Sequence, residues 1–275
     1  MSVAAEATFG EDLQDALAFA TDVAVRAGRI LLERYERVER VDHKSAKDVV
    51  TEVDHLSEAL ILAAIRERYP DDAILAEESG EHHAVKGEAP TLARGRTWVI
   101  DPLDGTVNYA NGIPFFCVSV ALLVEGLPAV GVIHDPMRSE TFAAVAGGPA
   151  TLDGRAVVVS DKERLEDLVV SLSLAGRGVA GRVRATRKAI RVSRNMGSAA
   201  LALAYVANGR FDAFIQTGGL STWDIAAAGL IAERGGATIT DMAGGSWFDL
   251  SRTTKTIGVL AAPPRHHAEL LRLTG

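Results

Sequence analysis

Apolar residues recur along this chain with two different periods, which predict two helices followed by a series of strands. Residues 11–35 carry an apolar residue every three or four positions, the spacing of a helix with one buried face. This stripe consists of Leu13, Leu17, Ala20, Ala24, Ala27 and Leu31. A second helix is predicted from about Asp54 to Tyr69, and Pro70 stops it because proline cannot continue a helix.

Short runs of apolar and β-branched residues predict the strands. In the first half these runs are Ala73–Leu75, Thr97–Ile100, Phe115–Val124, Ala129–Ile133 and Thr141–Val145. In the second half we expect strands at Leu168–Leu174, Ala189–Val192, Phe211–Ile215, Ala237–Thr240 and Ile257–Ala261, and helices at Ser198–Asn208, Ile225–Arg234 and His266–Leu273. The mixed order is typical of a layered α+β or α/β fold. Turn residues near Gly147 suggest an N-terminal part, 1–150, and a C-terminal part, 151–275.

Composition narrows the class of protein. A net charge of −7 disfavours nucleic-acid binding, which draws mostly on basic side chains. The longest apolar runs, such as Phe115–Val124, have about half the residues that a membrane-spanning helix needs. The N-terminal residues lack the pattern of a secretory signal, and the single Cys117 fits a reducing compartment. We therefore expect a cytoplasmic protein without a membrane partner.

A subset of the acidic residues stands at the ends of apolar runs rather than on polar faces. Its members are Asp54, Glu77, Glu78, Asp101, Asp104 and Asp224. Strand ends and helix starts are rigid, so side chains placed there can converge on one point. Converging carboxylates repel one another, and hard cations such as Mg²⁺, Mn²⁺ or Ca²⁺ relieve that repulsion through oxygen ligands.

The segment Asp101–Thr106 combines two of these acids with turn-forming residues. Pro102 biases Asp101 toward an extended conformation, so the strand should turn and present Asp101 and Asp104 to one point. The N–H groups of Gly105 and Thr106 could then face an anion. Taken alone, the same residues are equally typical of an ordinary capped turn.

Longer motifs resemble the inositol monophosphatase family. Trp98–Asn108, read as WVIDPLDGTVN, is similar to the first signature of that family, and Trp223–Gly229, read as WDIAAAG, to the second. Asp48–Asp54, Ala76–Ser79 and Gly197–Ala200 fall in the order of three further family elements. The resemblance spans roughly residues 44 to 262, and two long signatures in register are specific.

This resemblance implies an αβαβα sandwich, hydrolysis of a small phosphate monoester with two or three Mg²⁺ ions, inhibition by Li⁺, and a homodimer. Glu77, Asp101 and the Leu103 carbonyl match the ligands of one metal, and Asp101, Asp104 and Asp224 those of a second, while Glu77 could share a third. Asp54 and Thr106 match the pair that orients a water. Gly105 and Thr106 are expected to hold the phosphate, and Gly197, Ser198, Ala199, Gln216 and Asp224 the rest of the substrate.

Two departures from the family pattern leave the substrate open. Ahead of Trp223, the chain has Gln216 or Thr217 where inositol-selective members usually carry a glutamate. A basic run, made up of Arg177, Arg182, Arg184, Arg187, Lys188, Arg191 and Arg194, could clamp a second phosphate or simply be a solvated face. Inositol 1-phosphate is the favoured substrate. The alternative substrates are fructose 1,6-bisphosphate, histidinol phosphate and 3′-phosphoadenosine 5′-phosphate. An alternative function of another class is a regulatory binding protein on the same fold.

Overall fold

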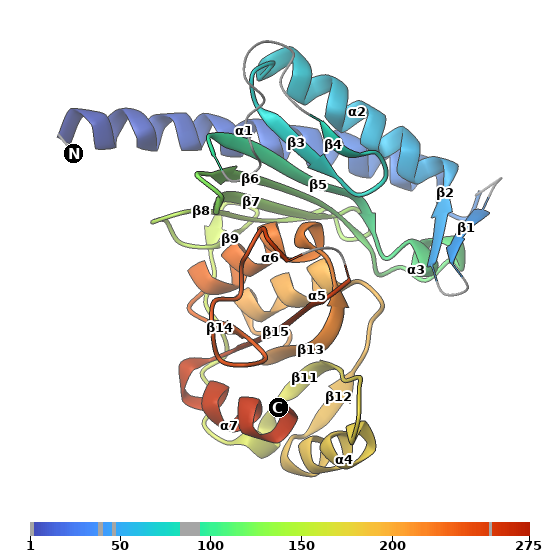
Figure 1. Cartoon of the computed structure of the whole chain (residues 1–275), viewed down its shortest axis with the longest axis vertical. Coiled ribbons are helices and arrows are strands. Elements are labelled where there is room, and N and C mark those ends of the chain that lie inside the picture. Colours follow the sequence, from blue (N-terminus) through green and yellow to red (C-terminus); the bar gives the residue numbers. More distant parts are fainter. Residues whose placement is uncertain (1–2, 38–40, 46–47, 83–93, 253–254) are drawn as a thin grey trace.

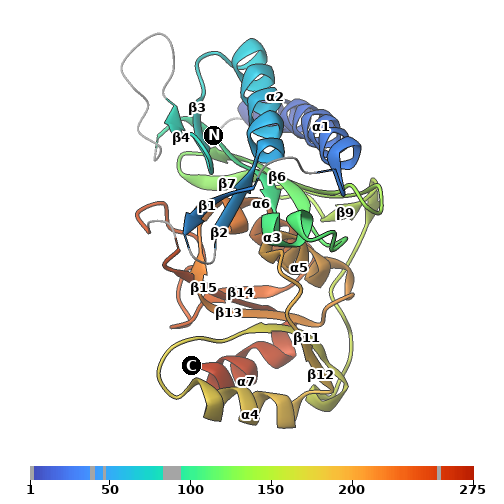
Figure 2. The ribbon, with the colours of Figure 1, turned by 90° about the vertical axis from the view of Figure 1, so that its right-hand side faces the viewer.

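The computed structural model describes residues 3–37, 41–45, 48–82, 94–252 and 255–275. They form five stacked layers, in which two β-sheets alternate with three pairs of helices (Figures 1 and 2). The helices are α1 (Val3–Arg34), α2 (Glu52–Arg68), α4 (Val179–Ala189), α5 (Ala199–Ala204), α6 (Thr222–Arg234) and α7 (Pro264–Thr274), with a short α3 (Thr106–Ala110) beside the first sheet. The αβαβα sandwich expected from the family resemblance is confirmed.

The first sheet has eight strands in the order β10-β9-β8-β7-β6-β5-β3-β4, with α1 and α2 on its outer face. Its strands are β3 (Ala73–Ala76), β4 (Gly80–His82), β5 (Arg96–Asp104), β6 (Cys117–Val124), β7 (Leu127–Asp135), β8 (Glu140–Val145), β9 (Thr151–Leu152) and β10 (Arg155–Ala156). Every pairing is antiparallel except β3 with β5. The predicted stripe on α1 is confirmed, because Leu13, Ala20 and Leu31 are buried against this sheet.

The second sheet has five strands in the order β12-β11-β13-β15-β14. These are β11 (Val169–Ser173), β12 (Val192–Arg194), β13 (Ala213–Leu220), β14 (Thr238–Asp241) and β15 (Ile257–Ala262). The outer helices α4 and α7 cover its far face (Figure 2). A separate two-stranded hairpin, β1 (Val41–Ser45) with β2 (Asp48–Thr51), leads directly into α2 and lies beside α3.

The middle helices α5 and α6 form the central hydrophobic core with the inner faces of both sheets. Small residues let these layers approach closely. A Cβ atom at Gly131 of β7 would lie 2.7 Å from the Ala227 carbonyl oxygen of α6, and one at Gly229 would lie 2.4 Å from the Trp247 ring. Close packing of α6 against the first sheet therefore depends on Gly131, and its contact with Trp247 depends on Gly229. The packing against the sheet fixes where the first turn of α6 lies.

One predicted segment is wrong. Sequence analysis predicts no helix between Leu174 and Ala189 and a strand at Ala189–Val192. Instead, Val179–Ala189 forms helix α4, and the strand is β12, at Val192–Arg194. Thr186 is the one residue of α4 that is buried, so the sequence lacks the apolar stripe by which a helix is found. The helix is favoured instead by alanine, arginine and lysine, which have high helix propensity.

The expected division near residue 150 remains a prediction. The first sheet continues past that point, because β9 pairs with β8 and β10 pairs with β9, up to Ala156. Among the described helices, none is both long and apolar enough to cross a membrane.

The close approach at Gly131 can be tested with two alanine substitutions. We expect Gly131→Ala to lower the free energy of unfolding by about 1–3 kcal/mol, because the new methyl group would overlap the Ala227 carbonyl. Gly181→Ala is the matched control, since Gly181 lies in α4 with nothing near the added atom and should gain about 0.5–1 kcal/mol. Denaturant unfolding of both variants measures the difference, and equal midpoints would contradict the packing described here.

Candidate active site

Asp101 and Asp104 lie at the end of β5 and point to the same side because the strand bulges between them. Asp101 pairs with Ser119 and Asp104 with Cys117, so β5 advances by three residues while β6 advances by two. Residues three apart on a regular strand face opposite sides, and one extra residue restores a common side. Pro102 fits this place because a bulge leaves a residue without a ladder partner. The Leu103 N–H donates to Asp101 Oδ1 at 3.0 Å, which fixes that carboxylate.

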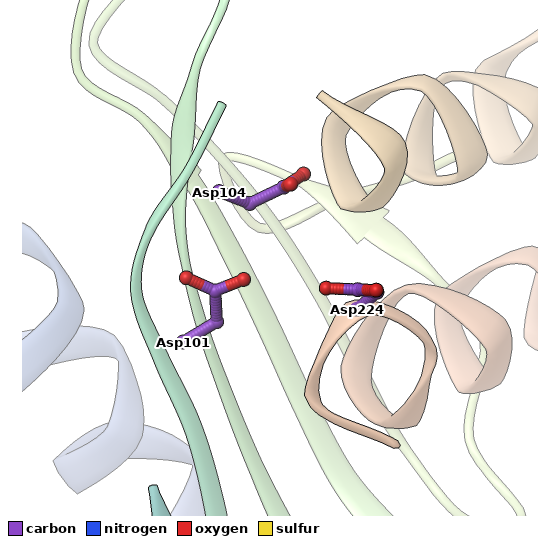
Figure 3. Close-up of side chains that lie close together, drawn as sticks. All are labelled: Asp101, Asp104 and Asp224. Carbon is purple, nitrogen blue, oxygen red and sulfur yellow. The ribbon is translucent and has the colours of Figure 1, made fainter. Parts of the chain in front are cut away.

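Asp224 reaches the same point from the opposite side, in the first turn of α6 (Figure 3). Ser221 and Asp224 form a capping box, in which the Ser221 N–H donates to Asp224 Oδ2 at 2.7 Å. One carboxylate oxygen each of Asp101, Asp104 and Asp224 lies within 4.8 Å of the other two. Two layers of the sandwich therefore meet at three carboxylates with the spacing of a metal site.

Asp104 also holds the start of α5. Its Oδ2 accepts the Ser198 hydroxyl at 2.5 Å and the Ala200 N–H at 2.7 Å. The preceding Gly197 has φ +85°, and a Cβ atom there would lie 2.6 Å from Asn108 Oδ1. Asn108 donates to the carbonyls of Phe115 and Met196, both at 2.7 Å. The Gly197–Ala199 segment is thereby held against α3, beside the carboxylates.

Burial, and after it repulsion among the carboxylates, raises the pKa values of this cluster. Burial raises the pKa of Asp101 well above its usual value, and the charges of Glu77, Asp104 and Asp224 raise it further. Burial likewise raises the pKa of Asp224, with Asp104 and Glu77 adding to the effect. The pKa of Asp104 is raised by burial and partly restored by its bond from Ser198. The donors are all hard oxygens, a set that fits Mg²⁺ or a similar cation.

Asp54 and Thr106 come together although they lie far apart in the chain. Asp54 is in the first turn of α2 and is fully buried, and Thr106 is the first residue of α3. The Thr106 hydroxyl lies 3.0 Å from Asp54 Oδ1 and 3.0 Å from the Leu103 carbonyl oxygen. The first turns of α2 and α3 thus bring a carboxylate and a hydroxyl together beside the carboxylate cluster.

Two adjoining cavities open at this point. The first, of about 180 Å³, is lined by Glu77, Asp101, Leu103, Asp104, Gly105, Thr106 and Asp224, among others. The second, of about 250 Å³, is lined by Ser198, Ala199 and Gln216 and shares Asp104, Gly197 and Asp224 with the first. Every site residue expected from the sequence lines one of the two cavities except Asp54, which is buried behind Thr106.

Several lining residues were not expected from the sequence. Lys255 brings a positive charge into the first cavity, and its N–H donates to the Ser221 hydroxyl at 3.2 Å. Ser171, Ser173 and Asn195 line the second cavity. The two serines stand two apart on β11 and so face one side, a signal that the sequence does contain. Lys255 lies in a loop before β15, where no periodicity marks it.

Gln216 lies on the substrate side, where β13 bulges. Gln216 pairs with Val259 and Leu220 with Ile257, so β13 has two extra residues there. Gly258 opposite the bulge is required, because a Cβ atom would lie 2.7 Å from Thr217 backbone atoms. The Gln216 side-chain amide donates to the Gly218 carbonyl at 3.1 Å, which leaves its own oxygen as an acceptor in the second cavity.

The basic run lies elsewhere, over α4 and β12. All seven of its residues are described by the structure, and none lines either cavity. Arg191 pairs with Asp167 at 2.5 Å, and Arg182 donates to the carbonyls of Ala175 and Thr274 at 2.8 and 3.0 Å. This placement favours the interpretation as a solvated face with structural contacts over a clamp for a second phosphate.

Comparison with known proteins identifies the family. The sequence pattern of the inositol monophosphatase family matches residues 12–274, and the chain belongs to that family. Nus factor SuhB of Pasteurella multocida is 37% identical, with 93% of this chain and 94% of the relative covered. An inositol monophosphatase of Mesembryanthemum crystallinum is 34% identical, with 88% and 90% covered. The crystal structure of the extragenic suppressor protein SuhB from Bartonella henselae superimposes with a TM-score of 0.85 at 32% identity, covering 94% and 98%.

The repulsion within the cluster gives a prediction for stability. A carboxyl group whose pKa is raised by folding favours the folded state fully below its unfolded pKa of about 3.9, and this contribution is lost as pH rises through the raised folded pKa. We expect Asp224→Asn to raise the unfolding temperature at neutral pH in EDTA, because one buried charge is removed. The same substitution should remove the stabilisation that Mg²⁺ gives the unaltered protein, about 2.7 kcal/mol at a hundredfold excess over Kd.

Calorimetry with and without Mg²⁺ measures both effects. Asp71→Asn, at an exposed turn position, is the matched control and should change neither. An Asp224→Asn protein that is less stable in EDTA and still stabilised by Mg²⁺ would show that the three carboxylates do not form one site.

Proposed function

We propose that the protein is a Mg²⁺-dependent phosphatase that hydrolyses a small phosphate monoester, with inositol 1-phosphate as the favoured substrate. The observation that carries this proposal is the convergence of Asp101, Asp104 and Asp224 within 4.8 Å at the mouth of a cavity that also contains Thr106. Membership of the inositol monophosphatase family supports it.

Each group has a role that its position supports. Asp101, Asp104 and Asp224, with Glu77 and the Leu103 carbonyl beside them, would hold Mg²⁺, which neutralises the phosphate charge when bound. Gly105 has φ +100° and lies at the N-terminus of α3, where N–H groups favour an anion. Thr106 orients the attacking water, and Asp54 receives the proton that the Thr106 hydroxyl gives up.

The second cavity suits a leaving group that carries hydroxyls rather than a second phosphate. Its polar side chains include Ser171, Ser173, Asn195 and Gln216, all uncharged hydrogen-bonding groups. Among the described residues that line the two cavities, Lys255 is the one basic side chain. A bisphosphate or a nucleotide would need more positive charge than this. Fructose 1,6-bisphosphate and 3′-phosphoadenosine 5′-phosphate are therefore secondary candidates. Histidinol phosphate has a single phosphate and ranks below inositol 1-phosphate because its leaving group carries an amine and an imidazole in place of hydroxyls.

A second function of another class is a regulatory binding protein on the same fold. The observation that favours it is that relatives at 37% identity are named Nus factor SuhB. The two functions need not exclude one another, because none of the seven residues of the basic run lines either cavity. A complete set of buried carboxylates is costly for a protein that only binds partners, which is why the phosphatase function is ranked first.

The proposed roles of Asp104 and Thr106 can be tested by substitution. We expect Asp104→Asn and Thr106→Ala each to lower kcat on the order of 10²-fold or more, since one removes a metal ligand and the other the group that orients water. Mg²⁺-dependent phosphate release measures the change, and thermal unfolding confirms that each variant folds. Asp153→Asn, at a remote turn, is the control. Full activity in either site variant would remove that residue from the mechanism.

The substrate preference can be tested with a phosphate-release panel. We expect inositol 1-phosphate to be hydrolysed on the order of tenfold or more faster than fructose 1,6-bisphosphate, histidinol phosphate or 3′-phosphoadenosine 5′-phosphate, because the second cavity offers hydrogen bonds to hydroxyls and little positive charge. EDTA should abolish all four rates. Equal rates would remove the preference, and activity that survives EDTA would contradict the metal requirement. Inhibition by Li⁺ and a homodimer remain predictions of the family resemblance.

A further inference from the structure

Two threonines hold the Asp54 carboxylate, one at each of its oxygens. The Thr106 hydroxyl lies 3.0 Å from Oδ1. At Oδ2, Thr51 donates twice, through its backbone N–H at 2.8 Å and its hydroxyl at 2.6 Å. Thr51 ends β2, is almost fully buried and precedes the first turn of α2. Thr51 was not among the site residues expected from the sequence.

The hydroxyl of Thr51 can point in one direction only. Its oxygen accepts the Val53 N–H at 3.2 Å, and an amide N–H can only donate. The Thr51 hydrogen is therefore left for Asp54 Oδ2. An oxygen that receives two donors is kept as an acceptor, so Oδ1 is the oxygen of Asp54 that is available for a proton from Thr106.

The Thr106 hydroxyl, by contrast, has two possible acceptors. It carries one hydrogen but lies 3.0 Å from both Asp54 Oδ1 and the Leu103 carbonyl oxygen. A charged acceptor makes a hydrogen bond roughly twice as strong as a neutral one, so the hydrogen is directed to Asp54 while Oδ1 stays in place. The lone pairs of the Thr106 oxygen are then free to face the cavity that this residue lines.

We propose that Thr51 is a positioning residue for the hydrolytic water, and that it acts by holding the Asp54 carboxylate in the orientation that takes the Thr106 proton. This inference rests on the proposed phosphatase function. As the water attacks, its O–H bond breaks and the proton bonds to the Thr106 oxygen. The original Thr106 hydroxyl proton passes to Asp54 Oδ1 in the same step, so each bond broken is matched by one formed.

The difficulty in testing Thr51 is that it also caps α2, so its removal affects folding. Thr51→Val keeps the branched shape and removes the hydroxyl, whereas Thr51→Ser keeps the hydroxyl. Each is made in the unaltered protein and in Thr106→Ala. Thr274→Val is the matched control, because it removes another buried hydroxyl, bonded to the Leu270 carbonyl at 2.7 Å in α7.

We expect Thr51→Val to lower kcat for Mg²⁺-dependent phosphate release on the order of tenfold or more, with KM changed less than about twofold, because ground-state binding is not affected. Thr51→Ser should keep about half of kcat or more, and Thr274→Val nearly all of it. In the Thr106→Ala background, Thr51→Val should cause no further loss, since the two residues act through one carboxylate.

Two results would overturn the proposal. One is an unchanged kcat in Thr51→Val, and the other is the same fractional loss in both backgrounds, which would mark Thr51 as purely structural. If the unaltered protein released no phosphate from any monoester, the proposed function would fail separately. The unfolding midpoints of the unaltered protein, Thr51→Val, Thr106→Ala and the double variant would then decide about Thr51. Non-additive shifts would support its coupling to Thr106 through Asp54, and additive shifts would contradict that coupling.

Discussion

The site is built around three mutually repelling carboxylates, one buried and two half-buried, and the N–H groups that hold them in place. Asp101 accepts an N–H from Leu103, Asp104 one from Ala200 and Asp224 one from Ser221. These donors belong to a strand bulge and to the starts of α5 and α6. Local backbone geometry thus sets three like charges side by side, where burial and mutual repulsion raise their pKa values. A cluster of this kind favours the binding of a cation between the carboxylates.

The layered fold defines where the three carboxylates meet. The first sheet supplies Asp101 and Asp104, and the central helices supply Asp224 and the Gly197–Ala199 segment. Close contact between α6 and β7 through Gly131 fixes the distance between the two contributions. Another side of the site comes from the first turns of α2 and α3, through Asp54 and Thr106. Packing therefore determines the geometry of the site, while capping hydrogen bonds determine the orientation of each carboxylate.

Most of the fold, and most of the predicted residues that line the two cavities, could be predicted from the sequence because both have local signals. The stripe of α1, the strands near the first signature and the acids at element ends could all be read directly. It missed helix α4, which buries only Thr186 and so has no apolar stripe. It also missed Lys255 and Asn195, which enter the cavities from loops whose course no local pattern specifies. Thr51 was missed although Thr51 and Asp54 have the T-x-x-D spacing of a capping box. What the sequence does not show is that the same Asp54 carboxylate contacts Thr106, 52 residues further on.

The bulge between Asp101 and Asp104 has a consequence for how this segment can vary. Because one extra residue is what brings the two aspartates to the same side of β5, the length of the segment matters more than the identity of its middle residues. Losing one residue there would restore a regular ladder with β6 and leave the two aspartates two apart, still on one side of β5. It would also remove the bulge, whose Leu103 N–H donates to Asp101 and whose Leu103 carbonyl lies against the Thr106 hydroxyl. The chain is therefore constrained in its spacing here by the backbone groups around the carboxylates.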